Sequence, residues 1–140
     1  MFEKINVEFK SCIIRDPVKR FVSAFKNRIL FHRDKEFSDH SVDLIIDKLE
    51  NGLFENKHFL PQNYWLGDNL NFFNIIGDVS NIENFTKDIN NFFGKKISFP
   101  KIQTGGNKFS ITLNVDQINK IKKIYSNDYD LIGSRIKRWK

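Results

Sequence analysis

An arginine and a serine bracket the segment Arg15-Asp16-Pro17-Val18-Lys19-Arg20-Phe21-Val22-Ser23, and both side chains can bind a phosphate. The guanidinium of Arg15 offers a planar fork of donors that matches phosphate oxygens. The hydroxyl of Ser23 can add one hydrogen bond. An apolar run precedes Arg15, and Asp16-Pro17 is typical of a helix start, where free amides and the helix dipole favour an anion. The segment therefore predicts an anion site at a strand–helix junction.

The elements that position this segment follow from hydrophobic spacing. The run 9–14 ends at a charged turn and predicts a buried strand. Phe21, Phe25 and Ile29 recur at helical spacing, which predicts a helix from Asp16-Pro17 to about Leu30 and puts Ser23 on the face of Asp16 and Arg20. An alternative stays open, in which Asp16 and Pro17 only cap the helix while Arg15 and Arg20 are solvated or ion-paired.

The rest of the chain predicts an α/β fold with parallel strands. We expect a second strand over 72–76 and irregular connections over 31–38 and 57–71. A further loop, with room for a short strand, covers 95–111. Helices are expected over 41–49, over 82–93 with Gly94 ending it, from a cap at Asn114 or Asp116 to about Tyr125, and over 129–140.

Composition favours an anionic partner. The formal net charge is +6, and a hydrophobic content of 40% with 15 Phe can fill a core. Nucleic acid is a rival partner, but the basic residues would point to several faces of a helix whose Phe side chains must be buried, and no standard nucleic-acid motif is present. These residues are Lys10, Arg15, Lys19, Arg20, Lys26, Arg28 and Arg33. We therefore expect no nucleic-acid partner.

Several other classes of protein are not indicated. Cys12 is the single cysteine and sits in an apolar run, which favours a core thiol over a nucleophile. No His/Cys cluster has metal-ligand spacing, so no metal is expected. The amino terminus lacks a signal-peptide core, and no apolar run approaches the roughly 18 residues of a membrane span. A cytoplasmic location is the resulting expectation.

The pattern Arg15-Asp16-Pro17, two residues, Arg20, two residues, Ser23 resembles the 3'-phosphate-binding motif of sulfotransferases. The resemblance is closest to the carbohydrate sulfotransferases of Golgi type and their bacterial relatives. Three further stretches are similar to family segments in order and spacing, so the resemblance covers nearly the whole chain. They are His58-Phe59-Leu60-Pro61-Gln62, the strand and helix within 73–85, and the terminal segment 125–133.

The resemblance implies a three-layer fold like that of P-loop nucleotide kinases, with a parallel sheet between helices. It implies transfer of a sulfuryl group from 3'-phosphoadenosine 5'-phosphosulfate to an acceptor hydroxyl, with a glycan sugar as the favoured acceptor. Arg15 and Ser23 carry over as ligands of the 3'-phosphate. Lys108, in the loop 105–108, is a candidate nucleotide contact or an ordinary exposed lysine.

His58 is a candidate general base, because sulfuryl transfer needs a group that accepts the acceptor's proton. The alternative is a packed or solvent-exposed histidine with no chemical role. His32 and His40 lie in a charged stretch and are expected at the surface.

One family feature is missing from the sequence. The family holds the 5'-phosphosulfate in a loop with a Lys and a Ser or Thr between its first strand and helix, and no residues before Arg15 resemble that loop. We therefore expect one domain over 1–140 that lacks the amino-terminal strand and phosphosulfate loop. The alternative is a non-catalytic, degenerate nucleotide-binding or interaction domain. An incomplete sheet would also leave an edge strand able to pair with another chain.

Overall fold

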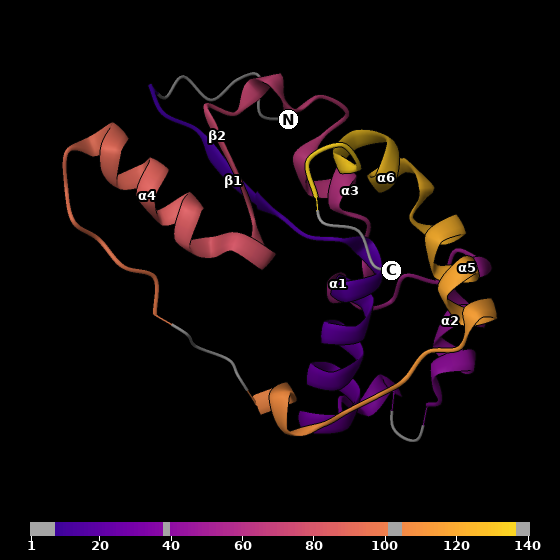
Figure 1. Ribbon diagram of the computed structural model, residues 1–140. Helices are drawn as coiled ribbons and strands as arrows, with labels where there is room; N and C mark the ends of the chain where they lie inside the picture. Colours follow the sequence, from indigo (N-terminus) through magenta and orange to yellow (C-terminus); the bar gives the residue numbers. More distant parts are fainter. Residues whose placement is uncertain (1–7, 38–39, 101–104, 137–140) are drawn as a thin grey trace.

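Two parallel strands, β1 (Ser11–Ile14) and β2 (Ile75–Asp78), lie at the centre of the computed structural model (Figure 1). The structure describes residues 8–37, 40–100 and 105–136. Ser11 pairs with Ile75 and Ile14 with Asp78, so the carboxyl ends of both strands lie at the same edge. The predicted α/β class with parallel strands is confirmed.

The predicted start of the second strand at Phe72 is wrong. Leu70–Phe72 forms a 3-10 turn because the side chain of Asn69 accepts a hydrogen bond from the backbone N–H of Asn71. Pairing begins only where Asn74 donates its N–H to the carbonyl of Lys10. The strand is therefore shifted toward Asp78.

The predicted helix after β1 is confirmed, with a change of winding. α1 (Pro17–Ala24) begins where Asp16 Oδ1 accepts the N–H of Lys19 at 3.0 Å. The chain continues as a π-helix, Phe25–Phe31, and Arg33 beyond its end adopts the left-handed conformation, with φ of 51°. The stretch 31–38 is not all loop, since Lys35–Phe37 is a 3-10 turn.

Three further helices begin or end at residues typical of helix termini. Ser41 caps α2 (Val42–Glu50), and Asn114 with Gln117 forms a capping box on α5 (Val115–Ile124). α4 (Ile82–Phe93) ends at Gly94, where φ is 60°. These three helices match their predicted positions.

Two predictions about irregular segments need correction. Residues 57–71 contain a 3-10 turn, Lys57–Phe59, and α3 (Gln62–Leu66). The adjacent Asn56 caps the turn, and the distant Asp128 accepts the first N–H groups of α3. The terminal helix, predicted over 129–140, is α6 (Ser126–Ile132). It ends at Gly133-Ser134, two poor helix formers, and residues 137–140 lie outside the described residues. In the described parts of 95–111 the only regular element is the 3-10 turn Gly105–Lys108.

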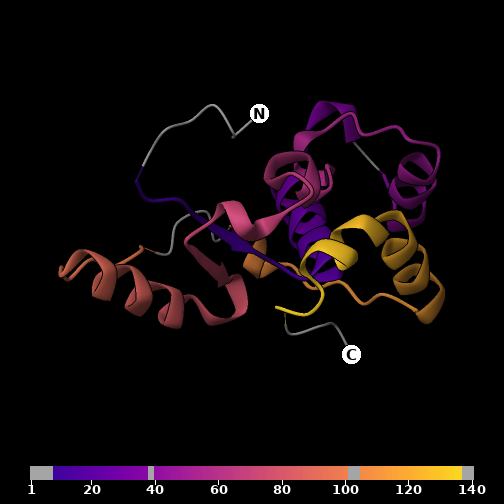
Figure 2. The same cartoon turned by 90° about the horizontal axis from the view of Figure 1, so that it is seen from above.

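The helices pack on two sides of the strands. In Figures 1 and 2, α4 lies on one side, and α1, α2, α5 and α6 lie on the other. α4 approaches β2 closely, since a Cβ added at Gly77 would lie 2.4 Å from the Phe85 ring. The larger core joins α1, the π-helix, α2 and α5 around Phe21, Phe59 and Tyr125, while a smaller one joins β1 to α6 through Ile14 and Ile132. Among the described residues, no helix is long and apolar enough to cross a membrane.

Candidate functional site

A cavity of about 380 Å³ opens beside α1, just beyond the carboxyl end of β1. Its wall comes from four separate stretches: the end of β1, α1 with the first turn of the π-helix, the turn around His58, and the 3-10 turn at 105–108. The lining residues are Arg15, Lys19, Arg20, Val22, Ser23, Ala24, Lys26, Asn27, His58, Gly106 and Asn107. No acidic residue is among them, so the cavity suits an anion.

Arg15 is half-buried at the mouth of this cavity. Among the described residues, no hydrogen bond or ion pair holds its guanidinium. Burial and the nearby charge of Arg20 lower the pKa of Arg15, while Asp16 and Asp78 oppose that shift. Arginine stays charged in proteins, so this side chain is a partly desolvated cation that a bound anion would stabilise.

Ser23 lies further along α1, half-buried, and lines the same cavity. The Asp16 carboxylate makes its contacts elsewhere. Its Oδ2 accepts a hydrogen bond from the hydroxyl of Tyr129 at 3.1 Å, and its Oδ1 caps α1. Asp16 therefore caps the helix, as the sequence alternative proposed for it, while Arg15 and Ser23 face a common cavity.

Arg20 links α1 to the stretch around His58. Its Nη1 donates to the carbonyl oxygen of Leu60. Burial lowers the pKa of Arg20, and the nearby Tyr125 and Asp128 oppose that shift. Arg20 thus adds positive charge to the cavity and holds its wall together.

His58 also lines the cavity with an exposed side chain, and Asn56 holds its ring. His58 Nδ1 lies 2.8 Å from Asn56 Oδ1, which also accepts the backbone N–H of His58 at 2.9 Å. Burial lowers the pKa of His58; Arg28, Arg20 and His32 lower it further, and Asp34 opposes them. The imidazole is therefore neutral at pH 7 and able to accept a proton.

Sequence reasoning missed the residues that support this wall. Asp128 is fully buried, and its two carboxylate oxygens accept the N–H groups of Gln62 and Asn63, each at 2.8 Å. Gln62 in turn bonds the backbone of Arg15. The hydroxyl of Tyr125 donates to the carbonyl of Phe59 at 2.6 Å. The segments 58–62 and 125–133 are thus one packed unit, a contact that no local pattern in the sequence reveals.

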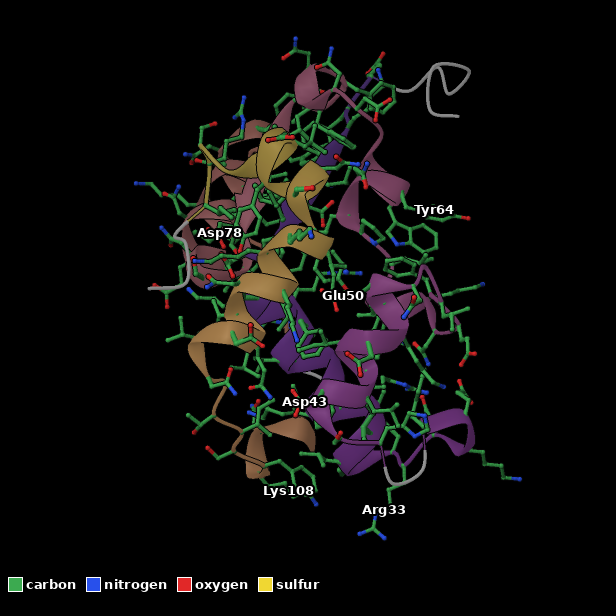
Figure 3. All side chains as sticks on the ribbon, turned by 90° about the vertical axis from the view of Figure 1, so that its right-hand side faces the viewer. Arg33, Asp43, Glu50, Tyr64, Asp78 and Lys108 are labelled. Carbon is green, nitrogen blue, oxygen red and sulfur yellow. The ribbon has the colours of Figure 1, made fainter. Side chains whose placement is uncertain are left out.

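Lys108 does not line the cavity, although its neighbours Gly106 and Asn107 do. Its ammonium lies 4.8 Å from the centre of the Phe31 ring. Figure 3 shows it at the end of the molecule where Arg33 also lies. A Cβ added at Gly106 would lie 3.3 Å from the backbone nitrogen of Asn27, so glycine lets this turn approach the helix closely. The sequence prediction for Lys108 remains a prediction.

Cysteine and metal chemistry receive no support from the geometry. Within residues 8–37, 40–100 and 105–136, no group of three or more His, Cys, Asp and Glu side chains could hold a metal ion. Burial raises the pKa of Cys12 to about 11, against the opposing effect of Arg135. The thiol therefore stays protonated at neutral pH and is a poor nucleophile.

Comparison with known proteins supports the motif interpretation at the level of the family. A family model described as "Sulfotransferase family" matches residues 2–133, which includes every residue of the cavity wall. No curated protein and no solved structure matches the chain.

Proposed function

Because the chain belongs to the sulfotransferase family, we propose that it binds 3'-phosphoadenosine 5'-phosphosulfate and serves sulfuryl transfer to an acceptor hydroxyl. One observation carries the proposal. Arg15 and Ser23 share one cavity that is lined by cations and by the 106–107 turn. A nucleotide with a 3'-phosphate supplies the charge that such a cavity lacks.

In the proposed complex, the 3'-phosphate accepts hydrogen bonds from the Arg15 guanidinium and the Ser23 hydroxyl. A charged donor on a phosphate gives a short, strong hydrogen bond, more so where water is partly excluded. We also propose that Lys108 turns from the Phe31 ring toward the bound nucleotide, since its neighbours Gly106 and Asn107 line the cavity.

The reaction breaks the bond between sulfur and the 5'-phosphate oxygen and forms one between sulfur and the acceptor oxygen. The leaving nucleotide is 3'-phosphoadenosine 5'-phosphate, and the acceptor's proton must go to a base. We propose His58 as that base, since it lines the same cavity and is neutral at pH 7. Positioning and charge stabilisation do the rest, as in phosphoryl transfer.

The finer features of the proposal rest on the resemblance of the motifs. We propose that β1 and β2 belong to a three-layer sheet of the P-loop nucleotide-kinase type, and that the acceptor is a sugar hydroxyl on a glycan. No described residue forms a loop resembling the one that holds the 5'-phosphosulfate in the family. Arg15 and Ser23 are accordingly proposed as the 3'-phosphate half of the site.

Calorimetry with two nucleotides tests the proposal. We expect 3'-phosphoadenosine 5'-phosphate to bind and 5'-AMP to bind much more weakly, with most of the difference lost in Arg15→Ala. Arg135→Ala is the matched control, because Arg135 is exposed and lies outside this cavity. Equal affinity for both nucleotides in the native chain would refute a dedicated 3'-phosphate site.

A second candidate, a non-catalytic nucleotide-binding domain, follows from the lack of a phosphosulfate loop among the described residues. It makes the same binding prediction and differs in turnover. Incubation with donor labelled in the sulfuryl group and a mixture of glycans separates the two candidates, because the second predicts binding with no labelled product.

A further inference from the structure

Asn56 occupies a buried position between His58 and a pair of carboxylates. Its side chain is 7% exposed. The amide nitrogen lies 3.3 Å from Asp34 Oδ2 and 3.3 Å from Glu36 Oε1. On its other side, the amide oxygen meets both the backbone nitrogen and the ring nitrogen Nδ1 of His58.

These neighbours allow only one orientation of the Asn56 amide. Carboxylates accept hydrogen bonds and cannot donate them when ionised, so they must face the NH₂ group. The backbone N–H of His58 can only donate, so at 2.9 Å it must face the oxygen. A flipped amide would place oxygen against two carboxylates and NH₂ against an N–H.

The orientation of Asn56 fixes the proton on the His58 ring. Asn56 Oδ1 is an acceptor, and His58 Nδ1 lies 2.8 Å from it, so Nδ1 must carry the hydrogen. In the neutral ring the other nitrogen, Nε2, then holds the lone pair. That is the nitrogen left to accept a proton.

An ion pair between Arg28 and Asp34 holds one of the carboxylates that Asn56 contacts. Arg28 on the π-helix donates to both oxygens of Asp34, from Nε at 2.6 Å and from Nη2 at 2.7 Å. The Asp34 side chain is only 12% exposed, and its backbone N–H donates to the carbonyl of Arg28 at 3.0 Å. A bidentate, largely buried pair of this kind holds a fixed geometry.

We propose that Asn56 is a positioning residue that sets the His58 tautomer, with the proton on Nδ1 and the lone pair on Nε2, and that the Arg28–Asp34 pair keeps Asn56 oriented. The proposal rests on the proposed function, in which His58 accepts the acceptor's proton. Asn56 Oδ1 can accept Nδ1–H in both the neutral and the protonated ring, so protonation at Nε2 needs no rearrangement behind the histidine.

Nuclear magnetic resonance tests the tautomer directly on the full chain without substrate. Long-range proton–nitrogen correlation spectra of ¹⁵N-histidine-labelled protein, taken above the pKa of His58, distinguish a protonated from an unprotonated ring nitrogen. His58→Gln assigns the signals. We expect a protonated Nδ1 and a bare Nε2 in the native chain. A protonated Nε2 would overturn the proposal, and this measurement needs no Asn56 variant.

Two variants test whether Asn56 is the cause. Asn56→Ala removes the acceptor, and we expect His58 to populate both tautomers. Asn56→Ser guards against misfolding, because Ser keeps an oxygen for the His58 backbone N–H as a cap but is too short to hold Nδ1. We expect it to lose the single tautomer too. Unchanged His58 spectra in both variants would refute the role of Asn56. Asn119→Ala, at an exposed position on α5, is the matched control.

Turnover separates this proposal from the proposed function. With a working acceptor, we expect Asn56→Ser to lower kcat on the order of tenfold, part of the roughly 10²–10⁴-fold that general base catalysis supplies, with little change in KM for the donor. If His58→Gln keeps full kcat, the catalytic role of His58 is wrong while the tautomer result stands. If His58→Gln loses kcat but the Asn56 variants lose neither kcat nor the tautomer, the positioning role is wrong.

Discussion

Gln62 pairs with the backbone of Arg15 through both ends of its side-chain amide. Its Oε1 accepts the N–H of Arg15 at 2.9 Å, and its Nε2 donates to the carbonyl oxygen of Arg15 at 2.8 Å. A side chain thus supplies the two hydrogen bonds that a neighbouring strand would otherwise give. Arg15 is held where β1 ends and the cavity begins, and the buried Gln62 depends in turn on Asp128.

Replacing Gln62 should therefore loosen Arg15 as well as destabilise the fold. Gln62→Ala removes two hydrogen bonds, each worth roughly 0.5–1.5 kcal/mol. We expect the free energy of unfolding to fall by about 1–3 kcal/mol and the affinity for 3'-phosphoadenosine 5'-phosphate to fall several-fold. Urea denaturation and calorimetry measure the two effects. Asn63→Ala is the control, since the bond of Asn63 to Asp128 uses only its backbone. If the free energy of unfolding is unchanged in Gln62→Ala, the pairing of Gln62 with Arg15 contributes nothing to stability.

Arg15 and Ser23 should contribute unequally to binding. Arg15 brings a full charge and a planar fork, whereas Ser23 brings one neutral hydroxyl. We expect Arg15→Ala to weaken 3'-phosphate nucleotide binding on the order of a hundredfold and Ser23→Ala on the order of tenfold, at about 1.4 kcal/mol per decade. Arg15→Lys should recover only part of the loss, because an ammonium lacks the fork.

Calorimetry on folded protein checks this ranking, with circular dichroism to verify folding. Both side chains are half-buried and lie outside the two buried clusters, so the variants should stay folded. If Ser23→Ala unfolds the chain while the folded fraction binds normally, Ser23 is a helix-packing residue and its assignment to the phosphate is wrong.

The sequence predicted what depends on local patterns. Asp16 caps its helix as predicted, Asn114 is the cap of the two candidates Asn114 and Asp116, and the helix predicted over 41–49 begins after a Ser41 cap. Only some residues of the candidate site could be predicted from the sequence. Arg15, Ser23 and His58 do line one cavity, but Asn56, Gln62 and Asp128 support it through bonds to distant segments or through buried polar contacts. No periodicity records such contacts. The second strand is shifted for a local reason, because the Asn69 side chain stabilises a 3-10 turn over residues that favour a strand. α6 begins earlier than predicted and so includes the buried Asp128, which bonds the distant start of α3.

Asp128 should be among the most sensitive polar positions outside the cavity. Its carboxylate is fully buried and accepts two backbone N–H groups at the start of α3. Asn at this position keeps the shape but offers one oxygen, so one N–H would face an NH₂ group. An unsatisfied buried donor costs roughly 1–3 kcal/mol, and we expect Asp128→Asn to lower the free energy of unfolding by about that amount.

Urea denaturation of Asp128→Asn beside Asp130→Asn measures this effect. Asp130 is exposed, so its variant removes the same charge from the same helix without touching α3. Equal unfolding curves for the two variants would contradict the structural role of Asp128. A loss confined to Asp128→Asn would support it.

The ratio kcat/KM should fall as the pH drops through the lowered pKa of His58. The ordinary histidine value is 6.5, and burial with nearby cations lowers the His58 pKa, so the neutral base form persists below that pH. A base works only when unprotonated, and kcat/KM reports the pKa of the free chain. We therefore expect kcat/KM to be level near pH 7 and to decline with a midpoint below 6.5. The same lowered pKa affects stability. The unfolded state binds more protons between the lowered pKa and 6.5, so the His58 contribution to stability is complete above 6.5 and is lost as the pH falls through that interval. A profile of kcat/KM against pH for the native chain and for His58→Gln measures the effect on catalysis, and the variant should lack the inflection. A midpoint above 6.5, or an inflection that survives in His58→Gln, would assign the titration to another group.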